Sequence, residues 1–150
     1  AIYTILIEQV FYGNMGGMND VEIEKIKEKI KGLAEKYNLS FVALFGSQSV
    51  GNLHSKSDID IAVLGKGAFD MNKLTIDLYD FFKREDVEVV DIGSASPTMM
   101  YVVVRDGKLL YEKKSGAFLK WKLYAIWVWR DTLWLRELRD KKLIEWAKTV

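Results

Sequence analysis

The sequence predicts an α/β fold of the α+β kind, in which a small mixed β-sheet is flanked by helices. Short apolar runs at residues 41–45, 59–64 and 87–92 have strand length and are separated by turn residues. Residues 21–37 and 70–83 instead carry apolar residues at three- and four-residue intervals, the spacing of amphipathic helices. At 150 residues and 49% hydrophobic, the chain can bury one sizeable core, so we expect a single domain.

We place that domain at residues 19–150 and treat residues 1–18 as an N-terminal extension to which the sequence assigns no role. Asn19 or Asp20 can cap the first helix, residues 21–37. The strand that follows, residues 41–45, is apolar throughout, which is typical of a central strand. The second strand is residues 59–64.

A helix over residues 70–83 and a third strand over residues 87–92 come next. Residues 97–105 are ambiguous, because their three consecutive valines favour a strand whereas Pro97 suits the first position of a helix; we favour the helix. Residues 108–112 are expected to form a short edge strand.

The last segment, residues 115–146, is predicted to be one long helix that carries all five tryptophans. One apolar stripe on it contains Trp121, Ala125, Val128 and Leu135, and another contains Leu123, Trp127, Trp134 and Leu138. One stripe can pack on the sheet, and the other, rich in indoles, suits an interface with a partner protein. Alternatively, both stripes are buried within the domain or in a homodimer.

Composition limits the other classes of protein. The chain has no cysteine, which rules out disulfides and is consistent with the cytoplasm, and no apolar run is long enough for a membrane span. Net charge is +1, yet residues 105–150 carry 12 basic and 6 acidic residues against 10 and 15 in residues 1–104. A basic end suggests an acidic partner or a polyphosphate, unless it is an ordinary solvated helix face; we expect no direct nucleic-acid binding.

The candidate site is formed by two short motifs. Gly46 and Ser47 end the first apolar run, where glycine lets the backbone approach a ligand and the hydroxyl can hold a phosphate. Asp58 and Asp60 open the second strand and project from the same side of it, since they are two residues apart. Two adjacent carboxylates are ligands that Mg²⁺ prefers. The alternative is a polar strand end that binds no ion.

At this spacing the two motifs resemble the signature of the DNA polymerase beta nucleotidyltransferase superfamily, and the short chain resembles its minimal, MNT-type members. The resemblance runs from about Val21 to about Lys141 and includes the passage from Gly107 to Tyr111. It implies a third metal-binding carboxylate on a neighbouring strand, which we assign to Asp91. Many members carry an arginine soon after the Gly-Ser pair, whereas this chain has no cation there before Lys56.

The resemblance implies an enzyme that transfers AMP from ATP to a hydroxyl and releases pyrophosphate. Two Mg²⁺ ions would be held by Asp58, Asp60 and Asp91, and the phosphates by Gly46 and Ser47. Among the minimal members, the chain resembles adenylyltransferase antitoxins of the MntA type, which modify a tyrosine of a helical HEPN ribonuclease toxin. The alternatives are an antitoxin that binds such a toxin without catalysis, and a small-molecule transferase of the aminoglycoside-modifying kind that works as a homodimer.

Overall fold

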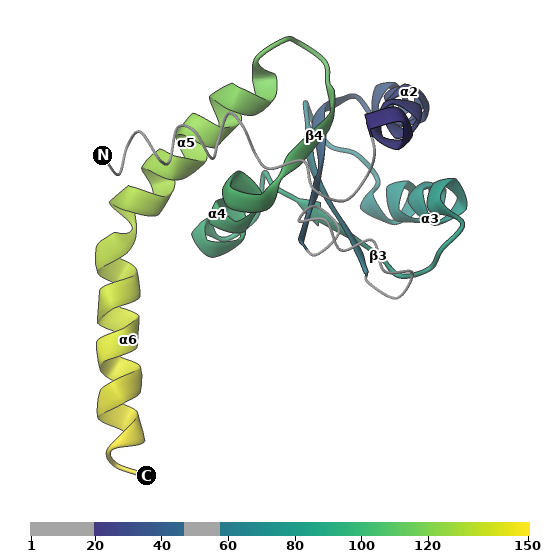
Figure 1. Cartoon of the computed structure of the whole chain (residues 1–150). Coiled ribbons are helices and arrows are strands. Elements are labelled where there is room, and N and C mark those ends of the chain that lie inside the picture. Colours follow the sequence, from purple (N-terminus) through teal and green to yellow (C-terminus); the bar gives the residue numbers. More distant parts are fainter. Residues whose placement is uncertain (1–19, 47–57) are drawn as a thin grey trace.

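The computed structural model describes residues 20–46 and 58–150, which form one four-stranded sheet with helices on both faces (Figure 1). The predicted fold class is therefore confirmed. Along the chain, the elements are α2 (Asp20–Lys36), β1 (Leu39–Phe45), β2 (Ile59–Gly65), α3 (Met71–Phe82), β3 (Val87–Asp91), α4 (Pro97–Asp106), β4 (Lys108–Glu112), α5 (Ala117–Asp131) and α6 (Leu133–Ala147). The predicted N-terminal extension, and Ser47 in the loop after β1, lie outside the described residues.

The strand order is β3-β2-β1-β4. β1 pairs antiparallel with both β2 and β4, whereas β2 and β3 are parallel. Because β1 lies inside the sheet between two layers of helices, its apolar residues are buried on both faces. The predictions that this strand is central and that residues 108–112 form an edge strand are both confirmed.

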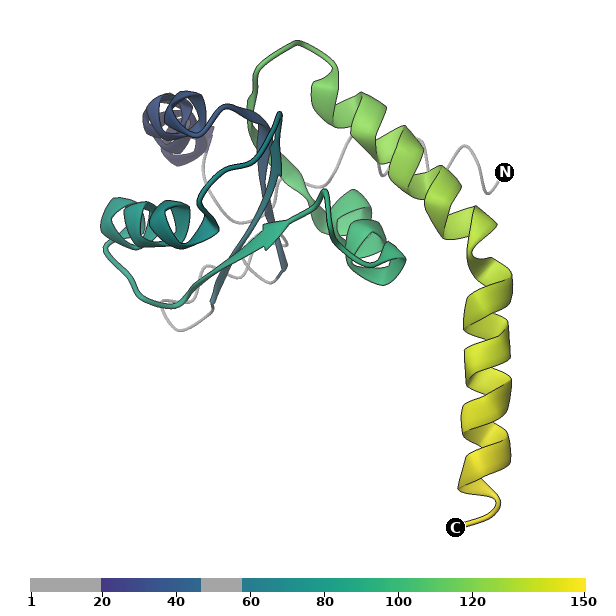
Figure 2. The ribbon, with the colours of Figure 1, turned by 180° about the vertical axis from the view of Figure 1, so that it is seen from behind.

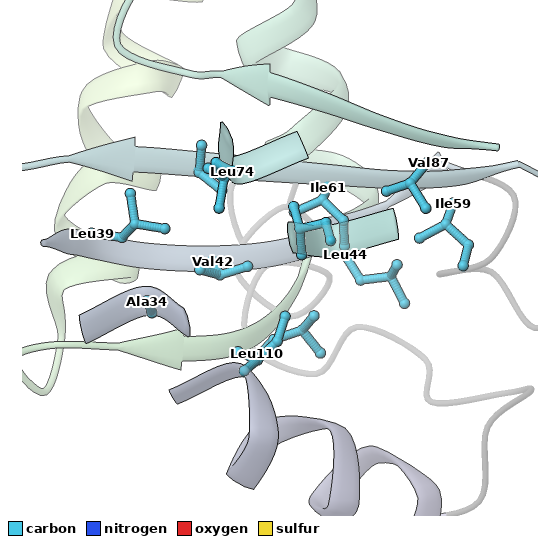
Figure 3. Close-up of a cluster of buried hydrophobic side chains, with 12 residues drawn as sticks. Ala34, Leu39, Val42, Leu44, Ile59, Ile61, Leu74, Val87 and Leu110 are labelled. Carbon is cyan, nitrogen blue, oxygen red and sulfur yellow. The ribbon is translucent and has the colours of Figure 1, made fainter. Parts of the chain in front are cut away.

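Alternate residues of the strands supply two separate cores, one on each face of the sheet. On the face covered by α2 and α3, Val42, Leu44, Ile61 and Val63 pack with Leu74 and their neighbours (Figure 3). On the face covered by α4 and α5, Phe41, Ala43, Phe45 and Ala62 pack against side chains of those helices. A strand residue can therefore be assigned to a face by counting in twos from these core positions.

The ambiguous segment after β3 is helix α4, as favoured from the sequence. The Ser96 hydroxyl accepts a hydrogen bond from the Met99 amide at 3.3 Å, and Pro97 occupies the first turn. Val103 and Val104 are buried against the sheet. Capping and burial together outweigh the strand preference of the valines, because propensity is only a weak prior.

The C-terminal segment is two helices rather than the single long helix predicted. The chain bends at Thr132, whose hydroxyl donates to the Val128 carbonyl at 2.7 Å (Figures 1 and 2). The Arg136 guanidinium donates to the Thr132 hydroxyl at 2.8 Å and to the Trp129 carbonyl, a group that would otherwise accept only within the helix. Side chains that bond to helix carbonyls in this way bend helices.

The two predicted stripes differ in how far the fold buries them. From the first, Trp121 and Ala125 are buried against the sheet, although Leu135 lies beyond the bend and is exposed. All four members of the second stripe are exposed, among them Trp127 at 61% and Trp134 at 62%. This contradicts the alternative in which both stripes are buried within the domain. None of the helices described is long and apolar enough to cross a membrane.

Candidate functional site

Gly46 and Asp60 lie against each other at the edge of the sheet where β1 ends and β2 begins. Phe45 is paired with Asp60, so the residue after β1 is directly beside the start of β2. Gly46 has φ of +72°, and a Cβ built on it would lie only 2.0 Å from Oδ2 of Asp60. Only glycine fits there, for its backbone conformation and for its size. The structure thus brings the two motif halves together.

Asp58 immediately precedes β2 and is exposed. The amide of the next residue, Ile59, donates to the Asp86 carbonyl at 3.0 Å, which continues the pairing with the chain that leads into β3. Asp58 is also close enough for its negative charge to raise the pKa of Asp60. The two carboxylates are therefore near enough to interact electrostatically.

A third carboxylate, which the sequence analysis missed, belongs to Glu88. Glu88 is the residue of β3 that pairs with Asp60 in the parallel register, so their side chains project from the same face of the sheet. Its charge also raises the pKa of Asp60. The signal that could have revealed it is the single acidic residue within the otherwise apolar run from Val87 to Val90.

Asp91, which the sequence analysis assigned as the third ligand, lies away from Asp60. Asp91 pairs with Val63, three residue pairs beyond Asp60, which is about 10 Å along the strands. Because the offset is odd, Asp91 also projects from the opposite face of the sheet, the one covered by α3. Its Oδ1 accepts a hydrogen bond from the Gly93 amide at 2.9 Å, so this carboxylate stabilises the turn after β3.

The electrostatics of the site favour a bound cation. Partial burial raises the pKa of Asp60 most, followed by the charges of Glu88 and Asp58. Within the described ranges, no three acidic or histidine side chains are already gathered closely enough to form a metal cage. Asp60 with Asp58 and Glu88 on either side is nevertheless an all-oxygen donor set that fits a hard divalent ion, which would relieve the repulsion between them.

Residues 28–116 match the polymerase beta nucleotidyltransferase family, and the fold and the paired motifs described above agree with this match. The chain belongs to this family. It is 29% identical over 100 residues to a protein adenylyltransferase, MntA, of Aphanizomenon flos-aquae, and 38% identical over 79 residues to the MntA of Shewanella oneidensis. The alignments cover 56% and 49% of this chain and 64% and 54% of the relatives, less than two thirds of either.

Two of the solved structures that share the fold are toxin-antitoxin complexes. One is a crystal structure of a toxin-antitoxin with AMP-PNP, with a TM-score of 0.67 at 30% identity, covering 79% of this chain and 98% of the other. The second is a tri-AMPylated Shewanella oneidensis HEPN toxin in complex with an MNT antitoxin, with a TM-score of 0.65 at 26% identity, covering 81% and 98%. The similarity therefore extends over nearly the whole of the matched structural chains.

Proposed function

We propose that this chain transfers AMP from ATP to a tyrosine hydroxyl of a helical HEPN-type toxin and thereby acts as an antitoxin. The observation that carries the proposal is the apposition of Gly46 and Asp60, flanked by Asp58 and Glu88. Further support comes from the relatives, which are named protein adenylyltransferases, and from the related structures of toxin-antitoxin complexes. Because ATP is the substrate, we place the reaction in the cytoplasm.

In this proposal the tight turn at Gly46, with Ser47 after it, holds the phosphates of ATP. Asp58, Asp60 and Glu88 would hold two Mg²⁺ ions at the adjoining strand edge, with Glu88 in the role that the sequence analysis gave to Asp91. When bound, such ions neutralise charge on the phosphates and lower the pKa of the attacking hydroxyl. The partial burial of Asp60 reduces the screening of this interaction by water.

The reaction is a phosphoryl-type transfer. The acceptor oxygen forms a bond to the α-phosphorus, the bond between that phosphorus and the oxygen that bridges to the β-phosphorus breaks, and pyrophosphate leaves with the bonding electrons. The acceptor hydroxyl gives up its proton to the surrounding water. What this chain contributes is the placement of the phosphates relative to the carboxylates, which is how catalysis of this kind is mostly achieved.

The test incubates the chain with ATP, Mg²⁺ and the HEPN-type protein encoded beside it, and follows the intact mass of that protein. We expect the mass to increase by one or more AMP groups. A chain carrying Asp58→Asn with Asp60→Asn serves as the control and should give no increase. Calorimetry of ATP with Mg²⁺ and then with a chelator checks that nucleotide binding depends on the metal.

The exposed stripe on α5 and α6 also favours an alternative function, in which the chain silences its partner by binding alone. Partner activity separates the two. If the chain carrying both aspartate replacements silences the toxin as completely as the unchanged chain, catalysis is not needed and the proposal is wrong.

A further inference from the structure

Helix α6 extends away from the rest of the molecule (Figures 1 and 2). Of its 15 residues only Arg136, at the bend, is partly buried, and all the others are exposed. A helix this exposed gains no stability from tertiary packing, and isolated helices of this length are marginal in water. Within residues 20–46 and 58–150, no other element therefore covers α6.

The apolar side chains of α6 lie all around the helix axis. They are Leu133, Trp134, Leu135, Leu138, Leu143, Ile144 and Trp146, exposed by 47–65%. At 100° per residue, these positions leave no sector wider than about 80° without an apolar side chain. Seven of the 15 residues of α6 are charged and lie between these apolar positions, so opposite sides of the helix each present apolar side chains among charged ones.

This distribution argues against a second copy of the chain as the occupant. In a two-fold dimer, the α6 helices of the two copies would pack along one side of each other and leave the opposite sides in water. On α6, Trp134 and Leu138 lie on one side, whereas Leu143 and Ile144 lie on the other. A partner that supplies at least two helices can cover both sides at once.

The exposed surface continues onto α5 and is surrounded by positive charge. Leu123, Tyr124 and Trp127 of α5 face away from the sheet, with the Tyr124 and Trp127 rings stacked at 6.4 Å. Residues 117–150 carry eight basic and four acidic residues. A partner that matches this surface has a channel between helices that is lined by apolar side chains and by acidic ones that can pair with the lysines and arginines.

From these observations we infer that α6 inserts between helices of the helical toxin partner and contacts it on two opposite sides, while the exposed face of α5 docks at the rim of the channel. The inference rests on the proposed function for the class of partner. It adds which surface binds and how that surface is covered. Insertion between helices would bury the tryptophans at 134 and 146 together, although they project from different sides of α6.

The experiment measures binding separately from AMP transfer. All variants are made in a chain that already carries Asp58→Asn and Asp60→Asn, and the probe is the purified HEPN-type protein encoded beside the chain. Trp134→Ala with Leu138→Ala changes one side of α6, and Leu143→Ala with Ile144→Ala changes the other. We expect each pair to raise Kd at least tenfold and to leave the melting temperature of the free chain unchanged.

Ile76→Ala is the matched control, because Ile76 is an exposed apolar residue on α3, in another part of the molecule, and should leave Kd unchanged. A rise in Kd for only one of the two pairs would show that α6 docks on a single side and would overturn the inference. No binding by the parent chain, or self-association of the free chain that both pairs abolish, would overturn it too. If the chain with both aspartates intact fails to transfer AMP while two-sided binding is observed, the proposed enzyme is contradicted but this interface is not.

Discussion

Asp60 of β2 is paired with Glu88 of β3, and both side chains project from the face of the sheet covered by α4 and α5. This pairing, together with Asp58 just before β2, puts three carboxylates at one edge of the sheet. Asp91 is three residue pairs away on the other face, where it accepts a hydrogen bond from Gly93. The two acidic residues of β3 are thus expected to differ completely in function.

We predict that Glu88→Gln abolishes AMP transfer whereas Asp91→Asn does not. The first change removes a negative charge that faces Asp60, and the second keeps an oxygen that can accept from the Gly93 amide. A reduction of transfer by at least about 100-fold is expected for Glu88→Gln, in the range that follows from losing one charged contact to a transition state. Intact mass of the partner, measured over time, reports the rate.

Binding of Mg-ATP provides the control for this pair of variants. Asp58 and Asp60 remain in both, so calorimetry should still detect nucleotide binding. If Glu88→Gln transfers AMP at the rate of the unchanged chain, Glu88 lies beside Asp60 but does not take part in the reaction.

The second prediction concerns pH and metal. The pKa of Asp60 is raised by burial and by the charges of Glu88 and Asp58, so the folded state disfavours its ionised form. For a raised pKa, the stabilisation is fully present below the pKa of the unfolded chain, about 3.9, and is lost as the pH rises through the folded value. Without metal, Asp60→Asn should therefore melt higher than the unchanged chain at pH 7, by a margin that shrinks toward pH 4.

Added Mg²⁺ should reverse this order at pH 7. The ion binds the ionised carboxylates and raises the melting temperature of the unchanged chain, while Asp60→Asn responds weakly. Thermal melts at several pH values, with Mg²⁺ or with a chelator, measure both effects. A difference between the two chains that is independent of pH would contradict the raised pKa as its cause.

Gly46 gives the third prediction. Alanine there would adopt an unfavourable positive φ and place its Cβ against the Asp60 carboxylate. We expect Gly46→Ala to lose about 1–3 kcal/mol of stability, which corresponds to roughly 2–4 °C in melting temperature for each kcal/mol. It should also lose metal-dependent ATP binding. Gly67→Ala is the control, since a Cβ at Gly67 meets nothing within 4 Å, and it should change neither property.

Much of the fold could be predicted because its signals are local. The caps Asp70 and Ser96, the proline after Ser96 and the fully apolar β1 each determine nearby structure without help from distant residues. The contact between Gly46 and Asp60 could be anticipated because the two motifs are close in sequence and flank adjacent antiparallel strands. Gly46 follows the last residue of β1, and Asp60 lies at the start of β2.

The third carboxylate and the C-terminal bend depend on tertiary geometry. Strands β2 and β3 are paired in parallel although α3 separates them along the chain, so a motif in the sequence does not reveal that Glu88 rather than Asp91 is opposite Asp60. The bend at Thr132 depends on Arg136 contacting the carbonyl of Trp129, a residue seven positions earlier. The periodic pattern of apolar residues in the sequence predicts neither of these contacts.

The last prediction concerns this bend, which determines where α6 points relative to the edge of the sheet that carries Asp60. The Trp129 ring lies between the Tyr101 ring of α4, stacked at 4.4 Å, and the Arg136 guanidinium, whose Cζ is 3.3 Å from the ring centroid. Stacking thus connects α6 to α4 through α5. We expect Arg136→Ala to loosen the angle of α6, because it removes both the cation–π contact and the hydrogen bonds at Thr132 and Trp129.

Spin labels can measure that angle, since the chain has no native cysteine to interfere. Labels at Asp80→Cys on α3 and Lys141→Cys on α6 should give a narrow distance distribution in the unchanged background and a broader one with Arg136→Ala. The matched control is Arg139→Ala, whose guanidinium pairs only with its neighbour Asp140 among the described residues and should leave the distribution narrow. AMP transfer should also slow with Arg136→Ala, because a partner docked on a loosely held α6 brings its hydroxyl to Asp60 less often. An equally narrow distribution for Arg136→Ala would show that the backbone at Thr132 holds the bend without the stacked side chains.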